Sequence, residues 1–156
     1  MLVRDLNREV YNLGFSGNGR LDLEVAEVMA SVDAGLYVID CLPNNKVDAL
    51  KANIDPFFQL LRSKRPDVPV LFVESPMFPG YLLDMNEEAT LKEKNAALRE
   101  YYEKLKKAGV KKIYYFETKN ILTEDRQGTV DGYHFTDLGF YRFEKKLLPV
   151  IQKILK

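Results

Sequence analysis

Two short apolar runs constrain the fold of this chain more than any other feature. Residues 36–39 (Leu-Tyr-Val-Ile) and 70–73 (Val-Leu-Phe-Val) are continuously apolar and rich in β-branched and aromatic side chains. A strand with one solvated face alternates apolar and polar residues, so a continuous run is typical of a parallel strand that is covered on both faces. The sequence therefore predicts an α/β fold with a parallel sheet.

Strand-like and helix-like segments alternate along the whole chain. We expect strands at residues 10–14, 36–42, 68–74 and 112–116. Helical periodicity predicts helices over residues 22–30, 46–62 and 86–108, and a last helix that begins near residue 137. Asp22, Asn86 and Asp137 are expected to cap three of these helices. In a sheet built this way, ligands bind at the carboxyl ends of the strands, so the loops that follow the strands are the place to look for a site.

Composition excludes several classes of protein. The 156 residues are 46% hydrophobic and 29% charged, which suits one globular domain over residues 1–156. The formal net charge of +0 lacks the basic excess of general nucleic-acid binders, so no nucleic-acid partner is predicted. No apolar run approaches the roughly 18 residues of a membrane span. Cys41 is the single cysteine, which excludes an internal disulfide and a cysteine-based zinc site, and we predict neither a metal nor a cofactor.

The single histidine is the strongest candidate for chemistry. His134 lies in the loop before the last expected helix, and Asp131 precedes it by three residues, with Gly132 between them. A lone histidine is more often structural than functional. Here, however, the spacing lets the carboxylate turn back onto the imidazole, fix its tautomer and stabilise its charged form, as the acid does in Ser-His-Asp hydrolases.

Three other strand-end segments carry candidate residues. The glycine-rich segment 14–19 is a turn, a phosphate-binding loop, or a loop whose bare N–H faces a developing oxyanion. Its spacing does not match G-x-S-x-G, so Ser16 is a poor nucleophile. Asn44 is either a turn residue or a neutral amide donor at the rim of a site. Glu74, at the end of the third expected strand, and Asn18 are candidate substrate contacts.

Taken together, these residues resemble the SGNH (GDSL-type) hydrolase family, in a bacterial subgroup. The family blocks match at Gly17, at Asn44, and at the D-x-x-H pattern of Asp131 and His134, in the family order. The asparagine block reads L-P-N-N rather than the usual G-x-N-D, but its first asparagine is kept. The resemblance implies a three-layer α/β/α, flavodoxin-like fold with strand order 2-1-3-4-5. It also implies a cofactor-free esterase that cleaves a small acyl ester, such as an acetyl ester, of a carbohydrate. His134 would be the base, Asp131 its orienting group, and Gly17 and Asn44 the oxyanion donors.

One family block has no counterpart in this chain. The nucleophilic serine of the family lies in a G-x-S-type turn after the first strand, ahead of the glycine loop. The serines here are Ser16, Ser31, Ser63 and Ser75, and none occupies that place. We therefore expect an N-terminally truncated domain that lacks its first, central strand and its nucleophile, and that is inactive as it stands.

The missing strand predicts a physical consequence and leaves other functions open. An unpaired strand edge favours marginal stability, aggregation, or dimerisation through that edge. A competing interpretation is a non-catalytic α/β module that binds a carbohydrate or a partner, and a third is nucleotide binding by residues 14–19. The sequence does not fix the cellular compartment.

Overall fold

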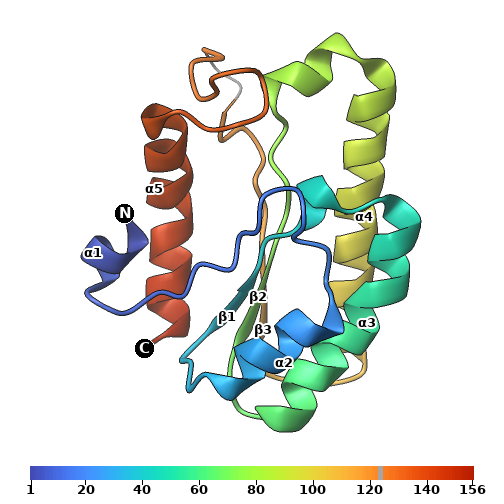
Figure 1. The fold of residues 1–156 in the computed structure, drawn as a ribbon, viewed down its shortest axis with the longest axis vertical. Helices are drawn as coiled ribbons and strands as arrows, with labels where there is room; N and C mark the ends of the chain where they lie inside the picture. The colour runs from blue at the N-terminus through green and yellow to red at the C-terminus, as the bar shows by residue number, and fades with distance from the viewer. Residues whose placement is uncertain (123–124) are drawn as a thin grey trace.

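The computed structural model describes residues 1–122 and 125–156 (Figure 1). Over these residues the chain forms one parallel sheet of three strands in the order β1-β2-β3. The strands are β1 (Tyr37–Ile39), β2 (Val70–Val73) and β3 (Ile113–Phe116). Val38 pairs with Leu71, and Leu71 pairs with Tyr114, so β2 is the central strand. The parallel sheet predicted from the apolar runs is confirmed.

Helices cover both faces of the sheet and make three layers (Figure 1). One face carries α2 (Leu23–Ser31), α3 (Val47–Lys64) and α4 (Met85–Lys107), and the other carries α1 (Leu2–Leu6) and α5 (Asp137–Ile154). Two short 3₁₀ helices, η1 (Leu42–Asn44) and η2 (Pro79–Leu83), follow β1 and β2. The fold is thus the three-layer α/β/α arrangement that the resemblance implied. No described helix combines the length and apolar character that a bilayer crossing requires.

The central strand explains why its sequence is apolar throughout. Val70 and Phe72 pack toward α3 and α4, and Leu71 and Val73 pack toward α5. All four residues of β2 are at most 1% exposed. Burying side chains of this size stabilises a fold by roughly 1.5–3 kcal/mol each. Two layers of core therefore meet on one short strand, which leaves no face of β2 for a polar residue.

The expected strand at residues 10–14 does not form. Val10 and Tyr11 are 44% and 64% exposed, and the backbone closes local turns instead of a ladder. The Gly14 N–H donates to the Asn12 side chain at 2.9 Å, and the Phe15 N–H donates to the Leu13 carbonyl at 2.9 Å. Asparagine side chains compete with sheet pairing in this way, and among the described residues no strand pairs with this segment.

The outer edge of β1 consequently has no paired strand among the described residues. Among the described residues, β1 pairs with β2 alone. The Tyr37 N–H donates to the Pro69 carbonyl on the β2 side, so the backbone groups of Val38 point to the unpaired side. Val38 as a residue is 37% exposed.

Two helices begin one or two residues away from the expected caps. The Asp84 carboxylate accepts the N–H of Asn86, so Asp84 rather than Asn86 caps α4. The Thr136 hydroxyl accepts the N–H of Gly139, so Thr136 rather than Asp137 caps α5. In both cases the sequence offers two adjacent or nearby capping residues, and the structure uses the earlier one. Asp22 lies at the start of α2 without a side-chain capping bond.

Candidate active site

The loop before α5 is held in place by short-range contacts. The Val130 N–H donates to the His134 carbonyl at 2.8 Å, and the Thr136 N–H donates to the Gly128 carbonyl at 3.1 Å. Thr136 also donates its hydroxyl to the Gln127 carbonyl. A Cβ on Gly139 would lie 1.9 Å from the Gly128 carbonyl oxygen, so the start of α5 and the loop touch backbone to backbone. Only glycine permits this approach.

Asp131 and His134 form the pair that the D-x-x-H spacing predicts. Oδ2 of Asp131 lies 2.7 Å from Nδ1 of His134. Oδ1 of the same carboxylate accepts the backbone N–H groups of His134, at 2.8 Å, and of Tyr133, at 3.0 Å. The backbone N–H and the ring of His134, followed by the Tyr133 N–H, hold the pKa of Asp131 well below its usual range. The carboxylate stays ionised, and with Nδ1 engaged, Nε2 is the ring nitrogen that can act as a base.

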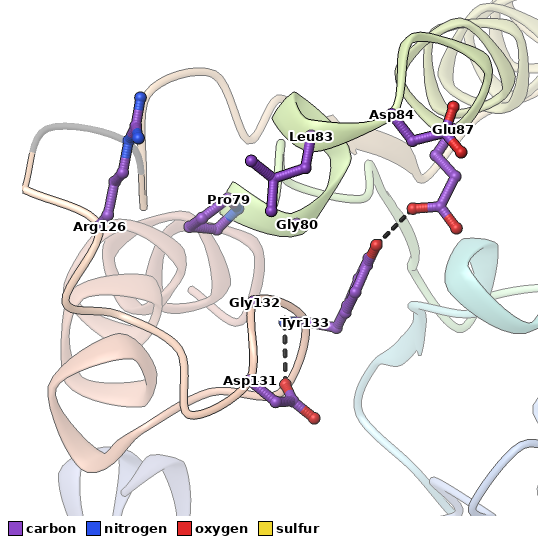
Figure 2. A pocket seen from close by; sticks show the side chains of 9 residues that line it. All are labelled: Pro79, Gly80, Leu83, Asp84, Glu87, Arg126, Asp131, Gly132 and Tyr133. Atoms are coloured by element: carbon purple, nitrogen blue, oxygen red, sulfur yellow. Dashed lines mark hydrogen bonds between the residues drawn. The ribbon is translucent and has the colours of Figure 1, made fainter.

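A second set of contacts ties this loop to η2 and α4 (Figure 2). The Gly80 N–H donates to the Gly132 carbonyl at 2.9 Å. The Tyr133 hydroxyl donates to the Glu87 carboxylate, and the Tyr133 ring packs edge-on against Tyr81 with 5.2 Å between centroids. Sequence reasoning missed Gly80, Tyr133 and Glu87. The Pro-Gly dipeptide at residues 79–80 was the local signal for a close backbone approach, whereas nothing in the sequence pointed to Glu87.

A cavity of about 440 Å³ opens between η2, the start of α4 and the loop. Figure 2 shows that the Tyr133 ring and the η2 side chains Pro79 and Leu83 border it. Its size falls within the range of small-molecule sites, roughly 300–1,000 Å³. The cavity shares Asp131 with the Asp131–His134 pair.

The two expected oxyanion donors lie on connected segments. Gly17 has a φ of +67°, and a Cβ there would meet no atom within 4 Å, so the turn is open to solvent. Asn44 ends η1 and is exposed. Asn45, which is 3% exposed, donates its amide to the carbonyls of Gly19, at 3.0 Å, and Cys41, at 2.8 Å. Asn45 therefore joins the glycine loop to η1, and it is a positioning residue that sequence reasoning missed.

The two expected substrate contacts have partners within the protein. The Glu74 carboxylate accepts the Tyr115 hydroxyl at 2.7 Å and an Arg99 N–H at 3.0 Å, and its side chain is 12% exposed. The Asn18 amide donates to the Ser16 carbonyl at 3.0 Å. These bonds give both residues a role in holding the ends of their segments. Contact of either with a substrate stays a prediction.

The described part of the chain shows no nucleophile bonded to His134. The hydroxyls of Ser31 and Ser63 donate to helix carbonyls, and Ser75 is 1% exposed. Cys41 is a buried core residue, as expected, and burial together with the nearby Asp40 raises the pKa of its thiol to about 12. Within the same residues, no group of three or more His, Cys, Asp or Glu side chains could hold a metal ion.

Asp40 stands out among the other strand-end groups. It directly follows β1, the strand with the bare edge. Although the residue as a whole is exposed, the surrounding protein desolvates its carboxyl group and raises its pKa to about 6. Desolvation disfavours the charged form of a carboxyl group.

Fold and site together define the class of this protein. It is a three-layer α/β protein that carries an aspartate-held histidine in the loop between β3 and α5. Over residues 1–152 the sequence matches the GDSL-like lipase/acylhydrolase family. The chain belongs to that family, and the resemblance drawn from the sequence blocks is confirmed.

Solved structures agree with this assignment. A protein of Bacteroides ovatus ATCC 8483, named as a GDSL-like lipase, is 37% identical, with a TM-score of 0.84 over 89% of this chain. A salicylyl-acyltransferase from a tetracycline biosynthetic pathway is 15% identical, with a TM-score of 0.72 over 88% of this chain and 44% of its own. The family 3 carbohydrate esterase of Clostridium thermocellum is 17% identical, with a TM-score of 0.57 over 85% of this chain and 67% of its own. The last two share the fold.

The chain covers only part of the length of the solved structures that it matches. This chain spans 41% of the Bacteroides ovatus protein, which is less than half of its length. Among curated proteins, none matches the sequence significantly.

Proposed function

We propose that this chain carries the base and the oxyanion donors of an ester hydrolase that cleaves a short acyl group from a carbohydrate. The observation that carries the proposal is the Asp131–His134 pair, with its 2.7 Å contact and a carboxylate that also accepts two backbone N–H groups. A carboxylate bound in this way orients the imidazole and stabilises the imidazolium that forms when the ring takes a proton. Membership of the acylhydrolase family supports the reaction class.

In the proposed reaction, a serine hydroxyl attacks the ester carbonyl carbon, and Nε2 of His134 takes the proton of that hydroxyl. His134 then gives the proton to the leaving alcohol, which leaves an acyl-enzyme for water to cleave with the same base. The backbone N–H of Gly17 and the amide of Asn44 stabilise the tetrahedral oxyanion, each by about 3 kcal/mol. No serine of these 156 residues has the family position for this attack, so we expect the chain alone to hydrolyse esters only at trace rates.

The test joins this chain to an upstream segment that carries the first strand and the G-x-S-type turn of the family. Hydrolysis of p-nitrophenyl acetate is measured for the 156-residue chain, the joined protein and variants of the joined protein. We expect activity in the joined protein alone, and a loss of at least about a thousandfold in His134→Ala. Asp137→Asn is the matched control, because Asp137 lies near the loop but outside the pair, and it should retain activity.

Two results would contradict the proposal. One is a joined protein in which His134→Ala keeps most of the activity. The other is enzyme-like turnover by the 156-residue chain that Ser16→Ala abolishes, because Ser16 would then be the nucleophile that we reject.

A non-catalytic binding module is the second candidate function. It is favoured by the described residues, in which no hydroxyl or thiol is bonded to His134. A joined protein that folds and binds carbohydrate, yet has no esterase activity, would favour this candidate over the hydrolase.

We further propose that residues 1–156 form one domain and that copies of it associate through the edge of β1. Both core clusters pack on the same sheet, which supports a single domain. The backbone groups of Val38 that no described strand pairs, together with its 37% exposure as a residue, support edge pairing.

A further inference from the structure

We propose that the cavity beside the Asp131–His134 loop binds a sugar ring, with Tyr133 as the surface on which the ring stacks. As the alcohol part of the ester, this sugar rests on the proposed function. Binding itself needs neither the serine nor turnover. The argument uses the shape of the cavity, the chemistry of its walls and its place next to the base.

The aromatic wall of the cavity is fixed in position. A Cβ on Gly80 would lie 2.5 Å from the Tyr133 ring, so the ring lies directly against the η2 backbone. Tyr81 packs against the Tyr133 ring in a T-shaped arrangement. Figure 2 shows the Glu87 carboxylate accepting the Tyr133 hydroxyl. Tyr133 as a whole residue nevertheless remains 37% exposed. A stacking surface that is already immobile loses little side-chain entropy when a ligand binds.

Apolar and polar groups both line the cavity. Pro79 and Leu83 line the cavity from η2, and Leu83, which is 87% exposed as a residue, lies where the cavity opens to solvent. Glu87 and Asp84 supply two carboxylates from the start of α4, and Arg126 stands at the opposite rim. Each carboxylate has about four acceptor sites. Glu87 accepts one bond from Tyr133, and Asp84 accepts one from the Asn86 N–H, so both keep capacity for hydroxyl donors.

This mixture of groups favours a polyhydroxylated ligand over a fatty acyl chain. Burying two carboxylates against methylene groups would remove their hydration without replacing it, which costs several kcal/mol for charged groups. A pyranose avoids that cost, because its hydroxyls donate to the carboxylates while its apolar C–H face covers Tyr133 and Leu83. Small-molecule sites are built in this way, from apolar walls with a few convergent polar groups.

The location gives the sugar a place in the reaction. Asp131 lines the cavity and also contacts the His134 ring. The cavity therefore lies beside the Asp131–His134 loop, on the side that faces η2. In the proposed mechanism, His134 delivers its proton to the leaving alcohol. His134 lies outside the lining of the cavity but on the same loop, and in our proposal a sugar held against Tyr133 is the leaving alcohol rather than the acyl group.

The proposal is tested with the 156-residue chain by ¹⁵N NMR titration. The probe is methyl β-D-glucopyranoside, whose equatorial hydroxyls leave a flat apolar face, and the comparison probes are choline and octanoate. We expect saturable shifts of the Gly80, Glu87 and Tyr133 amides with the glucoside, with a Kd of about 1–10 mM. Tyr133→Ala should weaken binding at least about fivefold, because it removes the stacking surface.

Leu83→Glu and Glu93→Gln complete the variant set. Leu83 is so exposed that its substitution should leave the fold intact, and replacing this apolar contact with a charged group should also weaken binding at least about fivefold. Glu93 lies on α4 outside the cavity, paired with Lys51, so Glu93→Gln should bind the glucoside as the wild type does.

The outcomes separate this inference from the proposed function. Absence of saturable shifts at the cavity, unchanged affinity in Leu83→Glu, or binding of choline or octanoate there in place of the glucoside would overturn it. Because the titration involves no ester cleavage, glucoside binding without turnover in the joined protein would remove the hydrolase proposal alone. Turnover without glucoside binding would remove the sugar site alone.

Discussion

Gly139→Ala tests whether the stability of the loop that carries Asp131 and His134 depends on its backbone contact with α5. In an unobstructed helix, alanine is favoured over glycine by roughly 0.5–1 kcal/mol. Helix propensity alone therefore predicts that this substitution, in the first turn of α5, stabilises the protein. The structure predicts the opposite sign, because the new Cβ would lie 1.9 Å from the Gly128 carbonyl oxygen and 2.9 Å from its carbon.

The size of the loss follows from the distance that must open. A carbon and a carbonyl oxygen in contact lie about 3.3–3.6 Å apart, so the loop must retreat by more than about 1 Å. Overpacking of this kind costs roughly 1–3 kcal/mol. The retreat also breaks the Thr136 bonds to Gly128 and Gln127, at about 1 kcal/mol each. Set against the propensity gain, the expected net destabilisation is about 2–4 kcal/mol.

Urea unfolding followed by circular dichroism measures this difference. Gly35→Ala is the matched control, because a Cβ there would meet Leu155 at 3.4 Å, an ordinary contact, and its stability should stay within about 0.5 kcal/mol of wild type. Gly128→Ala should fall between the two, since its closest neighbour is the movable Leu122 side chain at 2.8 Å. A Gly139→Ala protein as stable as the wild type, or more stable, would refute the reasoning.

Three further predictions concern the site and the sheet edge. In the joined protein, Asn44→Ala should lower kcat about 100–1,000-fold with little change in KM, and an unchanged kcat would remove Asn44 from the oxyanion site. The wild-type chain should self-associate in sedimentation runs, and Val38→Lys should reduce that association by placing a charge on the β1 edge. A monomer with a sharp, reversible transition well above about 50 °C would contradict edge pairing. Because desolvation raises the folded-state pKa of Asp40 to about 6, the cost of ionising it grows as pH rises from about 4 to 6. Asp40→Asn should thus gain stability over the wild type at pH 7 but not at pH 4 in urea unfolding, and an equal difference at both values would exclude this origin.

The sheet was largely predictable because burial on both faces leaves a direct mark on composition. The run at residues 70–73 has no polar member, and the structure places all of it in the core. The strand predicted at residues 10–14 was wrong because a strand forms only where a neighbouring strand pairs with it. Its apolar content was compatible with pairing, but the local bonds of Asn12 and Gly14 prevail in the structure.

The site was predictable where its contacts are short in sequence. The Asp131–His134 bond follows from a spacing of three residues, and the structure confirms that contact, whereas the catalytic role assigned to the pair stays a proposal. The bond between Glu87 and Tyr133 joins residues 46 positions apart, and neither has a neighbour that marks it. Pairings of this range are set by how η2 and α4 pack, which no local pattern records.

The short span of the bonds around His134 also bears on how this region assembles. The hydrogen bonds that shape the loop close within residues 127–139, apart from those to η2 and α4. Short loops lose little entropy on closure, so this region can begin to order early, before Phe135 packs against the core over β2 and β3. Its amides should therefore keep their protection from hydrogen exchange even when the edge of β1 opens. We therefore expect the geometry of the Asp131–His134 pair to stay the same whether or not the edge of β1 pairs with a second copy of the chain.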